Sequence, residues 1–414
     1  MHILIVTPFY LPDGGPAAPL FTMLSEELVK RGNHITVITA VPHYPTGIVR
    51  PDFRYKRPVE TKENGVNVIR VPLLSINRAN LFQRLVQLFI FQIGATLSGI
   101  NKEYDVIFLN NPFFMTGIPL FFLGVVKRKP LVYAVYDVYP DIGIQTGIFR
   151  NRLIIQWVTT FEKYCLKKAT LIRILSKSFI PAIMRMDIPE NKIRLIYDWV
   201  DLKLIKPLPK ENDFSNEYGL SDKFIVLYAG NIGLSQGLEI VLDTAARFIS
   251  QPQIRFVLVG DGAGKVDLIS EAQKMGLPNV QFVPLQPRER LMQVLASASV
   301  ALIVLKKGAG FSSLPSKTYS IMASGKPIIA CLDEGCEARE LIERAQAGIC
   351  VDPENTEQLV EAIIKLRSDA QLCLAYGMKG RKYVEEFHSP QKAAEHFEDL
   401  FIECIELFEK HNTR

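Results

Sequence analysis

Short runs rich in Val, Ile and Leu alternate with helix-length amphipathic segments along most of the chain. This alternation is typical of parallel sheets whose strands are joined by helices packed on the sheet faces. In the first half, the runs predict strands within 2–8, 34–41, 66–73, 104–111, 130–137, 170–176 and 193–197. Between the first two, "PLFTMLSEELVKRGN" (19–33) has apolar residues at helical spacing and a glycine that would end a helix, Gly32.

The pattern halts at residues 198–223, a polar stretch with prolines and no sustained periodicity, which we interpret as an interdomain connection. It then restarts, and a final amphipathic segment covers 391–410. Two doubly wound α/β domains in tandem are expected, with a ligand site in a cleft between them. The strands of the second half are predicted within 224–231, 254–262, 280–285, 300–305, 326–332 and 347–352.

Composition agrees with a folded two-domain protein. A chain of 414 residues is longer than a domain with one hydrophobic core usually is. Of its residues, 48% are hydrophobic and 22% are charged, as in folded proteins. The six cysteines show no metal-ligand or redox spacing, so we expect reduced thiols and no metal site. The first residues read as a strand and a turn instead of a signal peptide, which favours a cytoplasmic protein.

Charge is unevenly distributed. Residues 1–205 contain 25 Lys and Arg against 15 Asp and Glu, whereas residues 206–414 contain 23 against 28. The basic half also holds two strongly apolar windows, 81–100 and 112–130, neither of which is uninterruptedly apolar over the roughly 18–20 residues that a membrane span needs. Buried core helices explain these windows, and peripheral contact with an anionic membrane surface is the alternative. The scattered cations argue against nucleic-acid binding.

Several glycine-rich loops follow predicted strands. "YLPDGGPAAPLF" (10–21) could present Gly14 and Gly15 to a phosphate or substrate, or could be a simple turn. It lacks the dinucleotide fingerprint. "VGDGAGKVDLI" (259–269) fails as a P-loop because Val259 takes a glycine position and Val266 follows the lysine. We therefore expect no magnesium–nucleotide site there, and Asp261 and Lys265 as turn and helix-cap residues.

The stretch "LPSKTYSIMASGKP" (314–327) follows another predicted strand and combines a helix start, a hydroxyl and a cation. A helix N-terminus, Ser316 and Lys317 together could bind a phosphate. The alternative is an ordinary helix beginning with proline and an exposed lysine. Lys306 and Lys307 are weaker candidates for the same role.

The ordered set of motifs resembles a GT-B retaining glycosyltransferase of family 4, of the kind found in bacterial surface-polysaccharide assembly. The resemblance rests on the Gly-Gly loop, "PHYPTG" (42–47), "YDVYPD" (136–141), "YAGNIG" (228–233), "LVGDG" and "PSKTYSIMASGKP". It implies an acceptor-binding Rossmann-like domain at 1–200, a nucleotide-sugar domain at 201–388, and a helix at 389–414 that returns to the first domain. It also implies a metal-independent reaction with retention at the anomeric carbon.

The chain departs from the family pattern at several positions. Ser312 and Ser320 take the places of the usual pair of glutamates, the second of which binds ribose hydroxyls. Asn231 and Gln236 take the places of the usual Arg and Lys, and Asn111 lies at or near the usual histidine. We expect the donor nucleotide to contact Gly14, Gly15, Asn231, Gly233, Gly262, Ser316, Lys317, Tyr319 and Ser320.

In such a reaction the leaving phosphate oxygen can itself take the acceptor proton, so a protein base is not obligatory. As base or acceptor-orienting group we predict Asp137, which directly follows a strand, with Asp141 and His43 as further candidates. Asp141 could instead be a helix cap, and His43 could be a loop histidine packed beside Tyr44.

The expected function is transfer of a sugar, which could be N-acetylated, from a UDP-sugar to a lipid-linked or glycan acceptor, without a separate cofactor. Two alternatives stay open. A sugar-nucleotide epimerase is disfavoured by the few histidines and missing glutamates, and a catalytically inactive nucleotide-binding subunit is suggested by the two serines.

Overall fold

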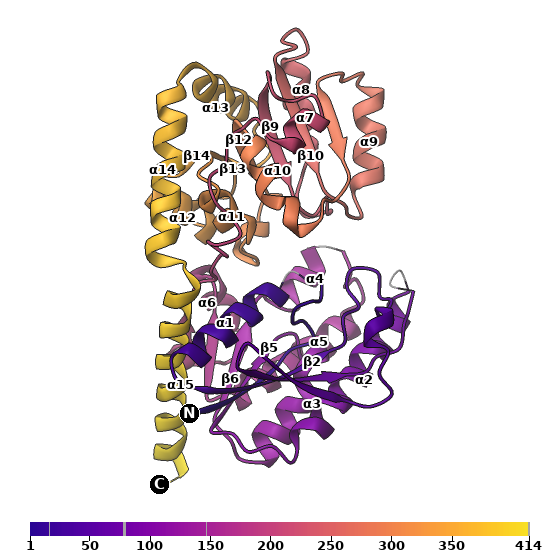
Figure 1. Cartoon of the computed structure of the whole chain (residues 1–414), viewed down its shortest axis with the longest axis vertical. Coiled ribbons are helices and arrows are strands. Elements are labelled where there is room, and N and C mark those ends of the chain that lie inside the picture. The colour runs from indigo at the N-terminus through magenta and orange to yellow at the C-terminus, as the bar shows by residue number, and fades with distance from the viewer. Residues whose placement is uncertain (16, 78–79, 146, 413–414) are drawn as a thin grey trace. The chain divides into compact units, whose positions relative to one another are not determined.

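The computed structural model describes residues 1–15, 17–77, 80–145 and 147–412. The chain forms two compact units, Met1–Asp198 with Pro390–Arg414 (unit 1) and Trp199–Ser389 (unit 2). Each unit is an open α/β sheet with helices on both faces (Figure 1). The predicted pair of doubly wound domains is therefore confirmed.

Unit 1 has a sheet in the order β3-β4-β2-β1-β5-β6-β7-β8, parallel throughout except for the β3–β4 pair. Every strand predicted for this half is present. The strands are β1 (His2–Val6), β2 (His34–Ala40), β3 (Val59–Glu63), β4 (Val66–Val71), β5 (Val106–Asn110), β6 (Leu131–Val135), β7 (Leu171–Ile174) and β8 (Ile193–Leu195).

Edge strand β3 was not predicted, because "VETKE" contains no apolar run. It pairs with β4 through a tight turn at Asn64 and Gly65, whose φ angles of 47° and 87° favour Asn and Gly. Its charged side chains leave the open edge of the sheet polar, which discourages further strand pairing.

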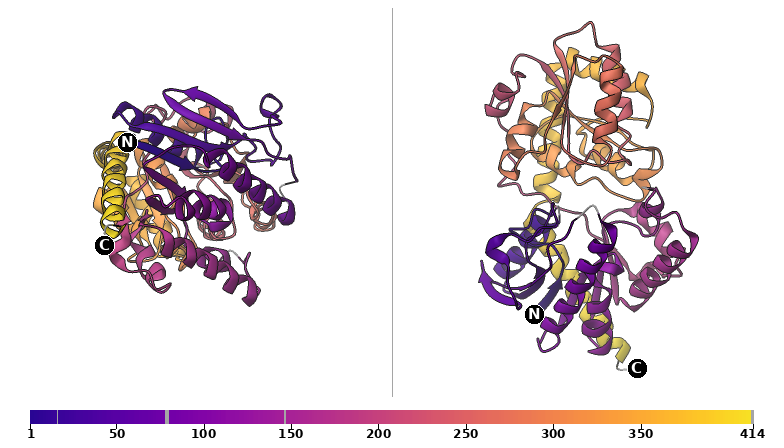
Figure 2. Two further views of the ribbon diagram at one scale, coloured as in Figure 1. Left: turned by 90° about the horizontal axis from the view of Figure 1, so that it is seen from below. Right: turned by 90° about the vertical axis from the view of Figure 1, so that its right-hand side faces the viewer.

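The helices of unit 1 lie in two layers (Figures 1 and 2). Helix α1 and the last helix, α15, pack together, and α15 also packs on β5 and β6, whereas α2, α3 and α5 cover other parts of the sheet. Gly32, with φ 88°, follows α1 as predicted. The helices are α1 (Ala18–Lys30), α2 (Leu81–Gly99), α3 (Phe113–Pro119), the π-helical segment η2 (Leu120–Val126), α4 (Asp141–Gln145), α5 (Arg152–Lys168), α6 (Ile180–Met184) and α15 (Pro390–Asn412), with short 3-10 turns at Pro51–Phe53, Lys177–Phe179 and Glu190–Lys192.

Unit 2 has an all-parallel sheet in the order β11-β10-β9-β12-β13-β14, and it too contains every predicted strand. Alternate residues of its strands enter two hydrophobic clusters, one on each face. The strands are β9 (Phe224–Ala229), β10 (Ile254–Val259), β11 (Val280–Val283), β12 (Val300–Val304), β13 (Ile328–Cys331) and β14 (Gly348–Val351). The helices are α7 (Asp213–Glu217), α8 (Glu239–Arg247), α9 (Lys265–Lys274), α10 (Leu291–Ser297), α11 (Lys317–Ala323), α12 (Glu337–Ala345), α13 (Thr356–Ser368) and α14 (Ala370–Phe387), with 3-10 turns at Arg288–Arg290 and Ala309–Phe311.

The interpretation of 198–223 as a plain connection is wrong. Most of this stretch belongs to unit 2, where Ile205, Phe214 and Leu220 are buried in the core. It also forms α7, which begins with a capping box between Asn212 and Ser215. Its apolar residues are widely spaced, and each enters the core singly. They therefore form no periodic pattern that would predict their burial.

The two apolar windows form α2 and the α3–η2 segment. No helix in the described ranges combines the length and apolar character that crossing a bilayer would need.

Candidate active site

In both sheets the strand order reverses beside a central strand, at β1/β5 in unit 1 and β9/β12 in unit 2. Ligands of open α/β sheets bind beyond the carboxyl ends of the strands at such points. The loops there are the ones that the sequence singled out, namely 7–15 after β1, 230–238 after β9 and 305–316 after β12.

Lys317 lies at the centre of the candidate site in unit 2. Its Nζ lies 3.8 Å from the centroid of the Tyr228 ring and 3.4 Å from Gln236 Oε1. A Cβ on Gly230 would lie only 3.1 Å from this Nζ, so the backbone of the β9 loop passes directly beside the ammonium group. The predicted lysine is thus held against the loop on the other side of the switch point.

Tyr228 and Gln236 position this lysine. The Tyr228 hydroxyl donates to the carbonyl oxygen of Asn231 at 2.6 Å and lies 3.0 Å from Gln236 Oε1. Burial raises the pKa of Tyr228, so the hydroxyl stays a donor. Gln236, at the position of the family's usual lysine, therefore orients Lys317 instead of carrying charge itself.

Burial also lowers the pKa of Lys317 to about 7. In the part of the chain that the structure describes, no carboxylate lies within ion-pair distance of its Nζ. A desolvated ammonium without a counter-charge is stabilised by a bound anion, which would raise its pKa again.

Glycines let the loops after β9 and β10 touch through their backbones. A Cβ on Gly260 would lie 1.9 Å from the carbonyl oxygen of Gly230, and one on Gly262 would lie 2.4 Å from that of Ile232. The Gly262 N–H donates to Asp261 Oδ1 at 2.9 Å. Gly262, predicted to contact the donor, thus has a packing role, and its N–H is already used.

Asn231 and Gly233 are brought together at the exposed side of the same loop. The Asn231 side chain folds over Gly233, where a Cβ would lie 2.5 Å from Nδ2. Lys265 Nζ donates to the Gly260 carbonyl at 2.9 Å, and with Asp261 it braces the β10 turn.

The start of α11 differs from the expectation. Ser316 is exposed and its side chain makes no capping hydrogen bond, and the helix is only seven residues long, so the argument for an anion rests on Lys317. Tyr319 was predicted to contact the donor, but it is 1% exposed and packs on His388 with ring centroids 4.7 Å apart. It belongs to the core. Ser320 is half-buried and Ser312 is buried.

The neighbouring lysines do not join this cluster. Lys306 lies beside Gly237 and 4.0 Å from Glu239 Oε1, and Lys307 is exposed.

In unit 1, the buried Asp13 organises the loop after β1. Its carboxylate accepts hydrogen bonds from the N–H groups of Gly15 at 2.7 Å, His43 at 2.8 Å and Tyr44 at 3.2 Å. Burial opposes ionisation of Asp13, but these hydrogen bonds and the His43 ring outweigh it and lower the pKa of the carboxyl. Asp13 thereby joins the Gly-Gly loop to the "PHYPTG" loop, a role that was not predicted.

The two glycines of this loop differ. Gly15 uses its N–H on Asp13, and a Cβ there would lie 2.6 Å from the Phe9 ring, so it serves packing and is not free for a ligand. Gly14 is exposed. His43 stacks on Phe9, and its Nδ1 lies 3.0 Å from the Val41 carbonyl, which it approaches as a donor. In that tautomer His43 Nε2 is the acceptor nitrogen.

Asp137 follows β6 and is half-buried. Burial, and secondarily the charge of Asp198, raises the pKa of Asp137 to about 6. Asn111 fixes the local backbone, because its Nδ2 donates to the Asp137 carbonyl at 2.6 Å while its Oδ1 accepts from Tyr136 N–H at 2.9 Å. A carboxyl with this pKa can exchange a proton near neutral pH.

Glu162 is a second buried carboxyl that sequence reasoning missed. It accepts hydrogen bonds from Phe113 N–H, Asn111 Nδ2 and the Tyr133 hydroxyl. Burial raises the pKa of Glu162 to about 7 in spite of these hydrogen bonds. It supports Asn111 and hence Asp137.

Asp141, by contrast, starts α4 and pairs with Arg185 at 3.2 Å, so the structure does not group it with Asp137.

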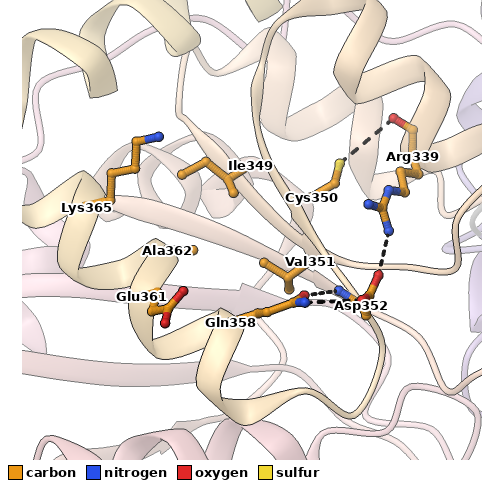
Figure 3. A pocket seen from close by; sticks show the side chains of 9 residues that line it. All are labelled: Arg339, Ile349, Cys350, Val351, Asp352, Gln358, Glu361, Ala362 and Lys365. Carbon is orange, nitrogen blue, oxygen red and sulfur yellow. Dashed lines mark hydrogen bonds and ion pairs between the residues drawn. The ribbon is translucent and has the colours of Figure 1, made fainter.

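A separate pocket of about 310 Å³ lies at the edge strand β14 (Figure 3). Three of its polar side chains are joined, since Arg339 donates to Asp352 and Asp352 accepts from Gln358. It is separated from β12 by β13 and takes no part in the site. Within the described ranges, no group of three His, Cys, Asp or Glu could hold a metal ion.

Known proteins resemble both halves. A sequence model described as Glycosyltransferase Family 4 matches residues 18–204, and one described as Glycosyl transferases group 1 matches residues 210–383. The chain is 28% identical to Escherichia coli K12 WcaI, described as a colanic acid biosynthesis glycosyl transferase, over 93% of this chain and 96% of that protein. It is 22% identical to an Escherichia coli O-antigen chain mannosyltransferase C over 98% of this chain and 99% of that protein.

Solved structures share the fold. A sucrose-phosphate synthase from Thermosynechococcus elongatus superposes with a TM-score of 0.76 at 20% identity, over 97% of this chain and 98% of the other. Anabaena HepE in complex with UDP and glucose gives 0.73 at 18% identity, over 97% and 100%. The chain therefore belongs to the GT-B glycosyltransferases, with a Family 4 domain followed by a group 1 domain, and is a glycosyltransferase.

Proposed function

We propose that this glycosyltransferase transfers a sugar, with retention of anomeric configuration and without a metal ion, from a UDP-sugar to a lipid-linked or glycan acceptor of a bacterial surface polysaccharide. The observation that carries the proposal is Lys317, a desolvated ammonium group placed against the glycine loop of the switch point.

Departure of the diphosphate is the difficult step in such a transfer. Positive charge and donors fixed where negative charge develops act on the transition state. Lys317 would supply that charge in place of the usual basic pair, with Asn231 Nδ2 as a further donor at the same loop. UDP is favoured as carrier because HepE, which shares the fold, has been solved with UDP and with UDP-glucose.

In the reaction, the bond between the anomeric carbon and the diphosphate oxygen breaks while the acceptor oxygen bonds to the same face of that carbon. The acceptor proton passes to the leaving phosphate oxygen, so charge and atoms balance without a protein nucleophile. Asp137 would orient the acceptor hydroxyl by accepting its hydrogen bond, a role that requires the ionised carboxylate present above about pH 6.

The acceptor and setting are proposed from the relatives and from the surface of unit 1. WcaI and the O-antigen mannosyltransferase are described as enzymes of colanic acid and O-antigen synthesis. The basic, apolar first half suits a peripheral enzyme on an anionic membrane, where a lipid-linked acceptor would be held.

Calorimetric titration with UDP tests the donor site. We expect Lys317→Ala to weaken UDP binding about tenfold to a hundredfold, because a charged hydrogen bond contributes about 1.5–3 kcal/mol. Since Lys317 must be protonated to pair with phosphate, the affinity of the native chain should fall as the pH rises above about 7. In Lys317→Arg that fall should disappear.

Lys274→Ala, at an exposed position of α9, is the matched control and should bind UDP like the native chain. Equal affinity of Lys317→Ala and the control would refute the assignment. Turnover of candidate donors with a polyprenyl-linked acceptor, in the presence of EDTA, tests transfer itself, and the anomeric configuration of the product by NMR tests retention.

A further inference from the structure

Helix α2 exposes a continuous apolar stripe. Phe82, Leu85, Phe89, Ile93 and Leu97 follow one another at intervals of three or four residues and are 40–73% exposed. Residues at this spacing share one side of a helix. Side chains of this kind are normally buried in a soluble protein, so the stripe is unusual.

Two neighbouring segments extend the stripe into a wider surface. Phe121 and Phe122 of η2 are about two-fifths exposed, and Leu153 and Trp157 of α5 are 75% and 56% exposed. Helix α2 packs on α3 and η2, and α3 packs on α5, where Phe113 contacts Trp157 with ring centroids 5.2 Å apart (Figure 1). We call the exposed apolar side chains of α2, η2 and α5 the apolar face.

The segments that carry the apolar face contribute exposed charges of one sign. Residues 81–100, 112–130 and 142–161 contain no Asp or Glu. Exposed arginines adjoin the face, with Arg128 two residues after Val126 and Arg152 directly before Leu153. Neither arginine forms an ion pair with another described residue. A second copy of the chain would bring the same cations opposite one another, which disfavours self-association here.

An apolar groove continues the face. A cavity of about 530 Å³ lies between α2 and the β3–β4 pair, and its apolar lining includes Ile69, Val71, Ile90, Ile93 and Leu97. Glu60 and Lys102 also line it and form an ion pair with each other at 2.8 Å. Ile93 and Leu97 therefore belong to both the stripe and the groove. A groove of this size and lining accommodates a hydrocarbon chain that enters from the same side.

From the stripe, the single sign of charge and the groove, we infer that unit 1 docks on an anionic lipid bilayer through the apolar face, with one lipid chain in the groove. The apolar side chains enter the boundary between headgroups and acyl chains while Arg128 and Arg152 meet anionic headgroups. This inference specifies the membrane contact of the proposed function, and it is independent of donor binding.

Co-sedimentation of the full chain with phosphatidylcholine vesicles, with and without phosphatidylglycerol, tests the docking. We expect binding to the anionic vesicles, weakened at high salt, and at least tenfold weaker binding of the Phe89→Gln/Leu97→Gln double variant. The matched control is Leu374→Gln/Met378→Gln, two similarly exposed apolar positions on α14, which should bind like the native chain.

Fluorescence gives a second readout. The chain has two tryptophans, Trp157 on the apolar face and the buried Trp199 in unit 2. On anionic vesicles, emission should shift to the blue and be quenched by brominated lipid, and Trp157→Phe should abolish both effects.

Absence of binding to anionic vesicles, or equal binding of the double variant and its control, would overturn the inference. So would a dimer in sedimentation analysis that the double variant dissociates, because a second copy would then cover the face. Calorimetry with UDP in the same preparations separates this outcome from failure of the donor site.

Discussion

At the residue scale, burial sets the chemistry of the two principal side chains. It pushes Lys317 toward losing its proton and Asp137 toward keeping one, and both pKa values move toward neutrality. Perturbed groups of this kind concentrate at functional sites, because activity requires the charge that burial penalises.

For Asp137 the acid side of the pH–rate profile is decisive. Below about pH 6 the carboxyl is protonated and no longer offers an ionised oxygen to the hydrogen bond of the acceptor hydroxyl, so kcat/KM should fall about tenfold per pH unit. Asp137→Asn should lower kcat by about a hundredfold and remove this acid limb. Steady-state kinetics between about pH 5 and about pH 8 provide the measurement.

Asp52→Asn, at an exposed position of the same unit, should keep both the rate and the acid limb. An unchanged acid limb in Asp137→Asn would assign the titration to another group.

Lys317 stands out in the sequence because it lies in the first turn of a predicted helix beside Ser316, and Asp137 stands out because it directly follows a predicted strand. The sequence did not show which residues would contact Lys317, or that Asp13 would contact the loop of His43. Lys317 and Gln236 are 81 positions apart, and Asp13 and His43 are 30 apart, so only the folded chain brings them together. Tyr319 lies in the core for a related reason, because the side of α11 that carries Tyr319 and Met322 is buried.

At the scale of elements, strands were predictable because β-branched runs bury both faces of a parallel sheet. β3 escaped prediction because an edge strand needs no such run, and α7 because one buried residue can anchor a helix of five. The close packing of the β9 and β10 loops could not be read from sequence either, since a glycine shows only that a Cβ is absent.

Substitution of Gly260 tests that packing. In Gly260→Ala a Cβ would meet the Gly230 carbonyl at 1.9 Å, at a φ of 153° that side chains rarely adopt. We expect a loss of unfolding free energy of about 3 kcal/mol or more, by urea denaturation, together with weaker UDP binding.

Gly276→Ala separates the cost of a positive φ angle from the cost of a steric clash with the added Cβ. Its φ is 61° and no atom lies within 4 Å of the added Cβ, so a cost of about 1 kcal/mol and unchanged UDP affinity are expected. Similar losses in both variants would mean that the two loops simply move apart.

At the scale of the whole molecule, α15 completes the unit that begins the chain. Phe401 is fully buried and its ring lies 5.7 Å from that of Phe108 on β5, while Glu398 bonds to Asn33 at 2.6 Å. The resemblance to GT-B enzymes implied that this helix returns to the first domain. The amphipathic pattern alone predicted a helix but did not show which part of the chain it packs on.

Phe401→Ala should destabilise unit 1 by about 3–5 kcal/mol, through the lost aromatic packing and the cavity left behind. Hydrogen exchange followed by mass spectrometry localises the effect. Peptides from β1, β5 and β6 should lose protection, while those from β9 to β14 should not.

Ile402→Ala, one position along α15 but 45% exposed, should leave exchange close to native. Equal loss of protection in both units for Phe401→Ala would show that the units unfold as one.

The division of the chain also fixes an order of synthesis. Unit 2 is one uninterrupted stretch, Trp199–Ser389, and all of it is translated before α15. Unit 1 is translated first yet lacks a layer of its core until Pro390–Asn412 emerges. During translation unit 1 therefore waits for α15, and Phe108 of β5 stays uncovered by that helix until it emerges.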